Sequence, residues 1–282
     1  MAASASSTTT PRFILYRGFP TTPAHVWSPF VNKLEARLRF ASVPYRIDVG
    51  SPRSAPRGKI PYLGVVPPAA AAEGAEPTQY LSDSTLITGQ LVSQGVLPDL
   101  NAALAPARRA QDLALRALLE DKFYFFATRE RWVDNHARMR DGVLAALPWP
   151  VRLLAGHLAY RAVSATLHGQ GAGRYSDEEA REIKREVWEA LEALLAEARR
   201  AAASTSGAGS AGGEREEPFW VLGGEQPSEA DATVYGFIAS ALVCTAAPET
   251  QKVVRSFPVL MDYAKRIHDT YFSDYDMWEE QV

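Results

Sequence analysis

The chain has 282 residues, of which 46% are hydrophobic and 22% are charged, and its formal net charge is −3. This composition is typical of a globular protein with about two domains. Residues of both signs are interspersed, so the sequence offers no basic surface for nucleic acid. The single cysteine, Cys244, excludes an internal disulfide, and its apolar surroundings in the sequence indicate a buried core residue.

The sequence also gives expectations for membranes and location. The longest uncharged stretch, residues 232–248, contains Thr and Gly and is shorter than a typical spanning helix, so we expect a buried core helix and no membrane span. Residues 1–11 are expected to form a disordered tail. Residues 1–10 are rich in Ser, Thr and Ala and lack the apolar centre of a secretory signal. We therefore expect a cytoplasmic protein. The absence of acidic residues from the tail leaves a mitochondrial association open.

Residues 12–100 alternate between strand and helix patterns. An apolar and aromatic run at 12–19 predicts a buried strand. Ser28-Pro29 then has the form of an N-cap followed by proline at the first helical position, and the helix ends before Pro44. Three further strands are predicted, at residues 45–49, from residue 60 and at residues 79–81. A helix is then predicted from Asp83-Ser84 to Leu91. The predicted order is β-α-β, a linker, and then β-β-α.

Two segments have the composition of insertions. Residues 67–77 and 201–217 are rich in Ala, Gly, Ser and Glu and contain no aromatic side chain. Such segments bury too little apolar surface to offset the entropy lost on ordering. Both are predicted to be mobile loops.

The rest of the chain, residues 106–282, carries helical patterns only. Residues 107–132 predict one long amphipathic helix. Ser176 with Glu179, and Ser228 with Asp231, have the spacing of capping boxes, and the second precedes the most apolar helix of the chain. We therefore predict an all-helical second domain.

Several sequence segments resemble a known superfamily. SPFVNKLEARLRFASVPY, GKIPYL and LSDSTLI look like the N-terminal domain of glutathione transferases. GQGAGRYSDEEAREIKREVWEALEALL, FWVLGGEQPSEADATVYGFIASAL and SFPVLMDYAKRIHDTYFSDY are similar to its failed-axon-connections branch, which is related to metaxins. The resemblance implies the glutathione-transferase fold, an α/β thioredoxin-like domain at 12–100 and an all-α domain at 106–282.

The resemblance also implies a role for Ser28. A helix N-terminus favours an anion, because its N–H groups are unpaired and the helix dipole is positive there. In serine-type and cysteine-type glutathione transferases the residue before the helix proline binds the glutathione sulfur. Ser28 is therefore the implied catalytic residue. From spacing alone, Ser before Pro is more often a simple N-cap.

Two further motifs are implied to hold glutathione. Ile60-Pro61 resembles the cis-proline of the superfamily, where the preceding residue offers backbone groups to the cysteinyl part. Asp83-Ser84 matches the acidic residue and Ser that receive the γ-glutamyl end, although many relatives have Glu in the first place. Lys59 is implied to contact the glycyl carboxylate. On spacing alone, a simple helix N-cap explains Asp83-Ser84 about as well as glutathione binding does.

A second pocket, for an electrophile, is implied beside the long helix of the second domain. Tyr124, Thr128 and Arg131 lie on one stripe of that helix. His25 and Trp27 of the first domain are the other implied lining residues. Aromatic residues in such a helix more often pack within the domain than line a ligand pocket. No Cys or carboxylate at the spacing of a metal site accompanies His157 and His168, so no metal is expected.

Two functions remain open at this point. The first is a transferase that uses glutathione as cosubstrate against a small electrophile, in conjugation, isomerisation or peroxide reduction. The second is a non-catalytic binding or adaptor protein related to metaxins. The joint presence of Ser28, Ile60-Pro61 and Asp83-Ser84 favours the first. The dimers common in the superfamily add a second copy of the chain as an expected partner.

Overall fold

The computed structural model describes residues 12–67, 76–205 and 217–278. These fall into two compact units, called here the sheet unit (residues 12–22 and 37–98) and the helical unit (residues 23–36 and 99–278). Helix α1 (Pro29–Phe40) begins in the helical unit and ends in the sheet unit. The predicted tail at 1–11 and most of the loops predicted at 67–77 and 201–217 lie outside the described residues.

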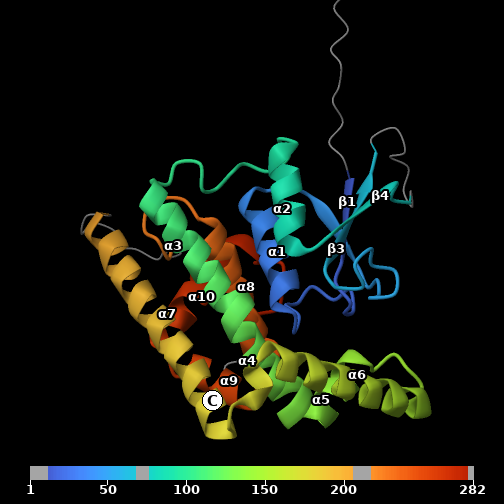
Figure 1. The fold of residues 1–282 in the computed structure, drawn as a ribbon. Coiled ribbons are helices and arrows are strands. Elements are labelled where there is room, and N and C mark those ends of the chain that lie inside the picture. The colour runs from blue at the N-terminus through green and yellow to red at the C-terminus, as the bar shows by residue number, and fades with distance from the viewer. Residues whose placement is uncertain (1–11, 68–75, 206–216, 279–282) are drawn as a thin grey trace, which may run out of the picture. The chain divides into compact units, whose positions relative to one another are not determined.

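The sheet unit contains a four-stranded sheet in the order β2-β1-β3-β4. β1 pairs in parallel with β2 and antiparallel with β3, and β3 pairs antiparallel with β4. This is the thioredoxin-like arrangement that the sequence predicts, with helix α2 after the last strand (Figure 1). The bounds are Arg12–Tyr16 for β1, Tyr45–Asp48 for β2, Tyr62–Val66 for β3, Gln79–Ser82 for β4 and Ser84–Ser93 for α2.

A row of leucines crosses three strands of this sheet. Leu15 is paired with Leu63, and Leu63 is paired with Leu81, and all three are buried. Directly paired residues point to the same face of a sheet, because side chains alternate along each strand. Burial of each leucine contributes about 1.5–3 kcal/mol. The row fixes the register that places the ends of β3 and β4 together.

The helical unit confirms the all-helical prediction, with one difference. The single helix predicted over 107–132 is a succession of α-helical and π-helical turns, and each π turn holds an extra residue that shifts the side chains around the axis. Its elements are α3 (Pro106–Ala117), η2 (Leu118–Phe123), α4 (Tyr124–Arg129) and η3 (Glu130–Asp134). After them come α5 (His136–Val143), α6 (Trp149–Gln170), η4 (Ala172–Arg174), α7 (Asp177–Thr205), α8 (Glu229–Val243), α9 (Pro248–Arg255) and α10 (Pro258–Tyr271).

Both predicted capping boxes are present. The Ser176 N–H donates to Glu179 Oε2 at 2.7 Å, and the Glu179 N–H donates to Ser176 Oγ at 3.2 Å. The Ser228 N–H donates to Asp231 Oδ2 at 2.8 Å. The buried Asp231 also accepts a hydrogen bond from the Tyr263 hydroxyl at 2.8 Å, which ties α10 to the start of α8.

Helix α8 forms the centre of the helical unit. Residues 230–242 are all buried, as expected for a helix that is apolar on every side. α3, α9 and α10 pack around it (Figure 1). Cys244 follows the helix and is fully buried, as predicted, and burial raises the pKa of its thiol.

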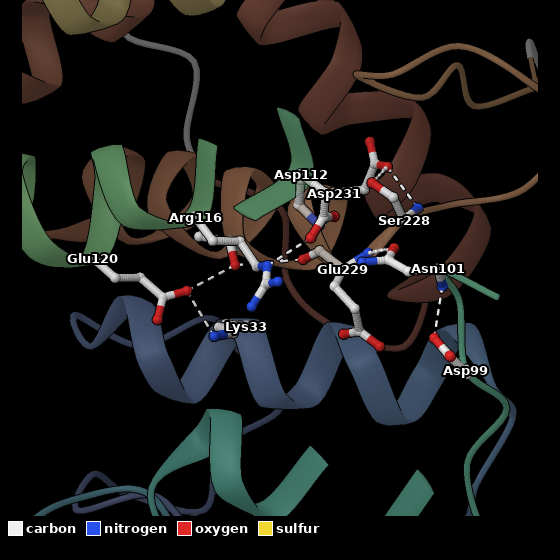
Figure 2. A network of polar contacts seen from close by, with 11 residues as sticks. Lys33, Asp99, Asn101, Asp112, Arg116, Glu120, Ser228, Glu229 and Asp231 are labelled. Atoms are coloured by element: carbon white, nitrogen blue, oxygen red, sulfur yellow. Dashed lines mark hydrogen bonds and ion pairs between the residues drawn. The ribbon is translucent and has the colours of Figure 1, made fainter. Parts of the chain in front are cut away.

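Polar side chains satisfy the first N–H groups of α8. The Glu229 N–H donates to Asn101 Oδ1 at 3.1 Å, and the Ala230 N–H donates to Asp112 Oδ1 at 2.7 Å. Asp112 is fully buried and is paired with Arg116 at 2.7 Å (Figure 2). A carboxylate at a helix N-terminus is stabilised by the unpaired N–H groups and the helix dipole.

The first half of α1 lies directly on α8. A Cβ atom added at Gly236 would be 2.6 Å from the backbone nitrogen of Lys33 and 2.7 Å from the backbone oxygen of Pro29, so only glycine allows this approach. The buried Lys33 ammonium forms an ion pair with Glu120 at 2.6 Å (Figure 2). The Thr233 hydroxyl donates to the same carboxylate at 2.9 Å.

We expect Gly236→Ala to destabilise the protein. The added methyl group meets backbone atoms that cannot rotate away, and overpacking of this kind costs about 1–3 kcal/mol. The matched control is Gly169→Ala in α6, where an added Cβ meets nothing within 4 Å. That change should be neutral or stabilising by up to about 1 kcal/mol. Urea unfolding curves measure both variants, and equal stabilities would contradict the packing described.

Candidate functional site

The Pro61 and Asp83 motifs meet at one end of the sheet. Pro61 immediately precedes β3, and Asp83 immediately follows β4. Tyr62 and Ser82 are paired across these strands, so the residues that flank them lie side by side. The Ile60–Pro61 peptide bond is cis, as predicted.

Asp83 has an unusual backbone conformation, with φ 74° and ψ 119°. Positive φ is rare outside glycine and costs of order 1–3 kcal/mol, and such residues cluster at functional sites. Asp83 Oδ1 accepts hydrogen bonds from the N–H groups of Thr85 and Leu86 at 3.0 and 3.2 Å, and therefore caps α2. Oδ2 takes part in neither bond, and the side chain is exposed. The Asp83 carboxylate thus lies at the N-terminus of α2, and its capping hydrogen bonds do not involve the Ser84 N–H.

The loop before β3 carries the remaining predicted glutathione contacts in this unit. Lys59 is exposed, and Ile60 is half-buried. The Ile60 side chain lies against Gly18, where an added Cβ would be 3.0 Å away. The loop thus presents a flexible cation next to a fixed backbone segment.

Ser28 caps α1, as its position before Pro29 predicts. Its Oγ accepts a hydrogen bond from the Val31 N–H at 3.4 Å, and its carbonyl accepts one from the Asn32 N–H at 3.2 Å. In the first bond the hydroxyl is the acceptor, and the same group can also donate its proton. Capping and donation to an anion are therefore compatible at Ser28.

Asn32 fixes the segment that leads into α1. Its side chain accepts from the Val26 N–H at 3.1 Å and donates to the Val26 carbonyl at 2.9 Å. Asn32 is fully buried, so these two bonds satisfy groups that water cannot reach. This role of Asn32 was not predicted, although an Asn inside a helix is a signal, because Asn is a poor helix former.

Arg131 and Ser240 hold the next residue of this segment. The Trp27 carbonyl accepts hydrogen bonds from Arg131 Nη1 at 2.8 Å and from the Ser240 hydroxyl at 2.6 Å. Arg131 Nη2 donates to Ser240 Oγ at 3.1 Å, and Arg131 is buried. Arg131 was predicted to line an electrophile pocket. Its hydrogen bonds make it a support of the segment before Ser28.

His25 has a similar structural position. Its Nε2 lies 2.7 Å from the Tyr235 hydroxyl. The ring is buried in an aromatic cluster that includes Phe272, Tyr275 and Trp278, with centroids 4.9–5.9 Å away. His25 was predicted to line the electrophile pocket, and its ring is enclosed by these aromatic groups.

The other predicted pocket residues are less enclosed. Trp27 is half-buried and lies against Gly142, where an added Cβ would be 2.2 Å from the indole ring. Tyr124 is half-buried and its ring is 4.9 Å from that of Phe30. Thr128 is also half-buried. Tyr124 and Thr128 remain the predicted polar contacts for an electrophile.

Glu130, next to Arg131, is a second residue that the sequence analysis missed. Its carboxylate accepts hydrogen bonds from the N–H groups of Glu249 and Thr250 at 3.0 and 3.1 Å, at the start of α9, and forms an ion pair with Lys184. Burial raises the pKa of Glu130, but the Lys184 ammonium and the bonds from Thr250 outweigh it and hold the pKa below its usual value. The ionised carboxylate anchors the backbone that carries Arg131.

Comparison with known families agrees with this geometry. Residues 29–137 match the family described as "Glutathione S-transferase N-terminal domain". Residues 217–267 match the family described as "Glutathione S-transferase, C-terminal domain". The two matches occur in the order of a complete transferase fold. The chain belongs to the glutathione-transferase superfamily.

Solved structures of glutathione transferases have the same fold. GSTFuA2 from Phanerochaete chrysosporium aligns with a TM-score of 0.54 at 15% identity, over 93% of this chain and 99% of that chain. GSTFuA3 from the same organism aligns with a TM-score of 0.53 at 15% identity, over 96% of this chain and 100% of that chain. Glutathione transferase Omega 1C from Trametes versicolor aligns with a TM-score of 0.50 at 14% identity, over 95% of this chain and 92% of that chain. At these identities the likeness concerns the fold.

Within residues 12–67, 76–205 and 217–278, no group of three or more His, Cys, Asp or Glu side chains could hold a metal ion. In the same residues no single helix is long and apolar enough to cross a membrane, and α8 with α9 pass that test only as a pair bent by 116°.

We expect Asn32→Ala to unfold at a lower urea concentration than the parent protein. The change leaves the buried N–H and C=O of Val26 without partners, which costs about 1–3 kcal/mol for each group. Asn135→Ala is the control, because Asn135 is half-buried and its side chain donates one hydrogen bond, to the Glu130 carbonyl at 3.0 Å. If Asn32→Ala were no more destabilising than the control, the proposed fixation of the segment before Ser28 would be wrong.

Proposed function

We propose that this protein binds glutathione at the sheet end formed by Pro61 and Asp83 and uses its thiolate against a small electrophile. The observation that carries the proposal is Asp83, an exposed carboxylate with positive φ at a helix N-terminus, beside the residue that precedes β3. Relatives in the superfamily, including the three solved structures above, are named glutathione transferases.

The chemistry of this sheet end suits the γ-glutamyl group, which carries one carboxylate and one ammonium. The N–H groups at the start of α2 suit the carboxylate. The Asp83 carboxylate suits the ammonium, and a charge-assisted hydrogen bond is about twice as strong as a neutral one. We place the backbone of Ile60 against the cysteinyl part and Lys59 against the glycyl carboxylate.

We assign the sulfur of glutathione to Ser28, whose hydroxyl would donate a hydrogen bond to the thiolate. Lowering a thiol pKa by about two units raises the thiolate fraction some 25-fold at pH 7, but nucleophilicity falls as the pKa falls. The net gain is only about threefold. Orientation of the electrophile must therefore supply most of the rate, and Tyr124 and Thr128 are the polar groups that we propose for it.

The alternative is a binding or adaptor protein without catalysis, as in the metaxin-related, failed-axon-connections branch that the sequence resembles. One observation favours it. His25 and Arg131 make contacts inside the helical unit, which reduces the polar groups available to an electrophile. Turnover of glutathione with an aryl halide or an organic peroxide distinguishes the two functions. A cytoplasmic location and a homodimer remain parts of the proposal.

Asp83→Asn should weaken glutathione binding while leaving the fold intact. Asn tolerates positive φ and can still cap α2 through its side-chain oxygen, but it lacks the negative charge that pairs with the γ-glutamyl ammonium. Loss of a charged contact costs about 1.5–3 kcal/mol, so affinity should fall about tenfold or more. Titration calorimetry with glutathione measures the effect.

Asp99→Asn is the matched control. Asp99 is also exposed, and its Oδ1 accepts a hydrogen bond from the Asn101 N–H at 2.9 Å. This variant should bind glutathione as the parent does. Unchanged affinity in Asp83→Asn, with a parent protein that does bind, would remove Asp83 from the site.

A further inference from the structure

Helix α6 exposes an apolar face. Its inner face packs on α5 (Figure 1) and on η3 and η4. At Gly156 an added Cβ would be 2.5 Å from the Arg140 side chain. On the outer face Val151, Leu154 and Leu158 are 50, 63 and 58% exposed. These residues are three and four apart, so they form one stripe along the helix. An apolar stripe on a helix normally faces a core, and this one is exposed.

The sequence around this stripe carries positive charge only. From residue 142 to residue 176 there is no Asp or Glu, whereas Arg152, Arg161 and Arg174 are present in a chain of net charge −3. Arg174 donates to the carbonyl of His168 at 3.1 Å, a bond that does not neutralise its charge. Arg152 donates to the carbonyl of Ala145 at 2.8 Å and also interacts with the Asp141 carboxylate. Arg161 is exposed three residues after Leu158. The apolar stripe is therefore continuous with a basic edge.

We propose that the outer face of α6 binds the surface of a membrane that contains anionic lipids, with the helix lying in the plane of the interface. A helix with exposed leucines and basic residues beside them is suited to the boundary between head groups and acyl chains. Trp149, at the start of α6, is 68% exposed, and indole rings favour this boundary. Arg161 can extend its side chain toward lipid phosphates while its methylene groups remain in the apolar layer.

The helix would lie on the bilayer and would not cross it. α6 is 22 residues long, but it is not among the segments that pass the length and hydropathy test for a span. Arg152 and Arg161 divide its apolar sequence, and a charged residue at the bilayer centre costs at least about 2.5 kcal/mol. Shallow insertion buries the leucines and keeps both charges near the head groups.

A second copy of the chain fits this face less well. In a two-fold dimer the same patch meets itself, so the basic edge would approach another basic edge. No carboxylate between residues 142 and 176 could compensate for that repulsion. An anionic surface supplies the missing negative charge.

Vesicle sedimentation with the full chain tests the proposal. The protein should sediment with vesicles of phosphatidylcholine and phosphatidylglycerol, and at least about tenfold less with phosphatidylcholine alone, because about 1 kcal/mol is gained for each basic residue near an anionic surface. Raising the salt concentration should weaken the binding. Leu154→Ser combined with Leu158→Ser should lower it by at least about tenfold, since two largely exposed leucines lose their apolar contact.

Arg161→Glu tests the charge separately, and we expect about a tenfold loss at low salt. Leu113→Ser in α3 is the control, because Leu113 is also highly exposed, at 59%, but lies on another helix. It should bind vesicles as the parent does. None of these variants should change glutathione affinity, so the outcome is independent of the proposed function.

Three results would overturn the proposal. The first is equal binding to neutral and anionic vesicles, or no binding to either. The second is retention of binding in the double leucine variant while its thermal unfolding shows an intact fold. The third is a dimer in sedimentation equilibrium that the leucine changes dissociate, which would show that a second copy covers the face.

Discussion

The close approach of α1 to α8 at Gly236 is the constraint on which the proposed sulfur site depends. Backbone atoms of Lys33 and Pro29 occupy the space where any larger residue would place its Cβ. Such contact requires that every polar group nearby has a partner, because water is excluded. Lys33 is paired with Glu120, and the same carboxylate receives the Thr233 hydroxyl.

This contact orients the start of α1. Val26 is held by Asn32, and Trp27 is held by Arg131 and Ser240. All of these groups belong to the helical unit, and Trp27 is held by a side chain that follows it by 213 positions in sequence. A rigid helix N-terminus is preorganised for an anion, since its N–H groups need not move when the anion binds.

Local chemistry explains which features the sequence predicted correctly. The strands, the caps at Ser28 and Asp83 and the capping box at Ser228 depend on residues within a few positions of one another, so their spacing is visible in the sequence. The resemblance to glutathione transferases supplied the cis bond at Ile60–Pro61, which no spacing could give.

Long-range contacts explain what was missed. Arg131 was expected to face a ligand because it shares a helical stripe with Tyr124 and Thr128. Arg131 lies in the π-helical turn η3, whereas Tyr124 and Thr128 lie in α4, and a period of 3.6 cannot represent the change of angular position that a π turn introduces. His25 was expected to line the electrophile pocket, and the aromatic groups that enclose it come from the other end of the chain.

The most direct measurement of the central claim is the fate of a thiol placed at residue 28. In Ser28→Cys the helix N-terminus should lower the thiol pKa below its free value of about 8.5. Oxidised glutathione should then form a mixed disulfide there and release one glutathione thiolate. Mass spectrometry should find one adduct on the peptide that contains residue 28, while the buried Cys244 stays unmodified. Addition of Asp83→Asn should slow the adduct at low concentrations of oxidised glutathione. If the new thiol forms no adduct, or if Asp83→Asn leaves the rate unchanged, glutathione does not bind with its sulfur at Ser28.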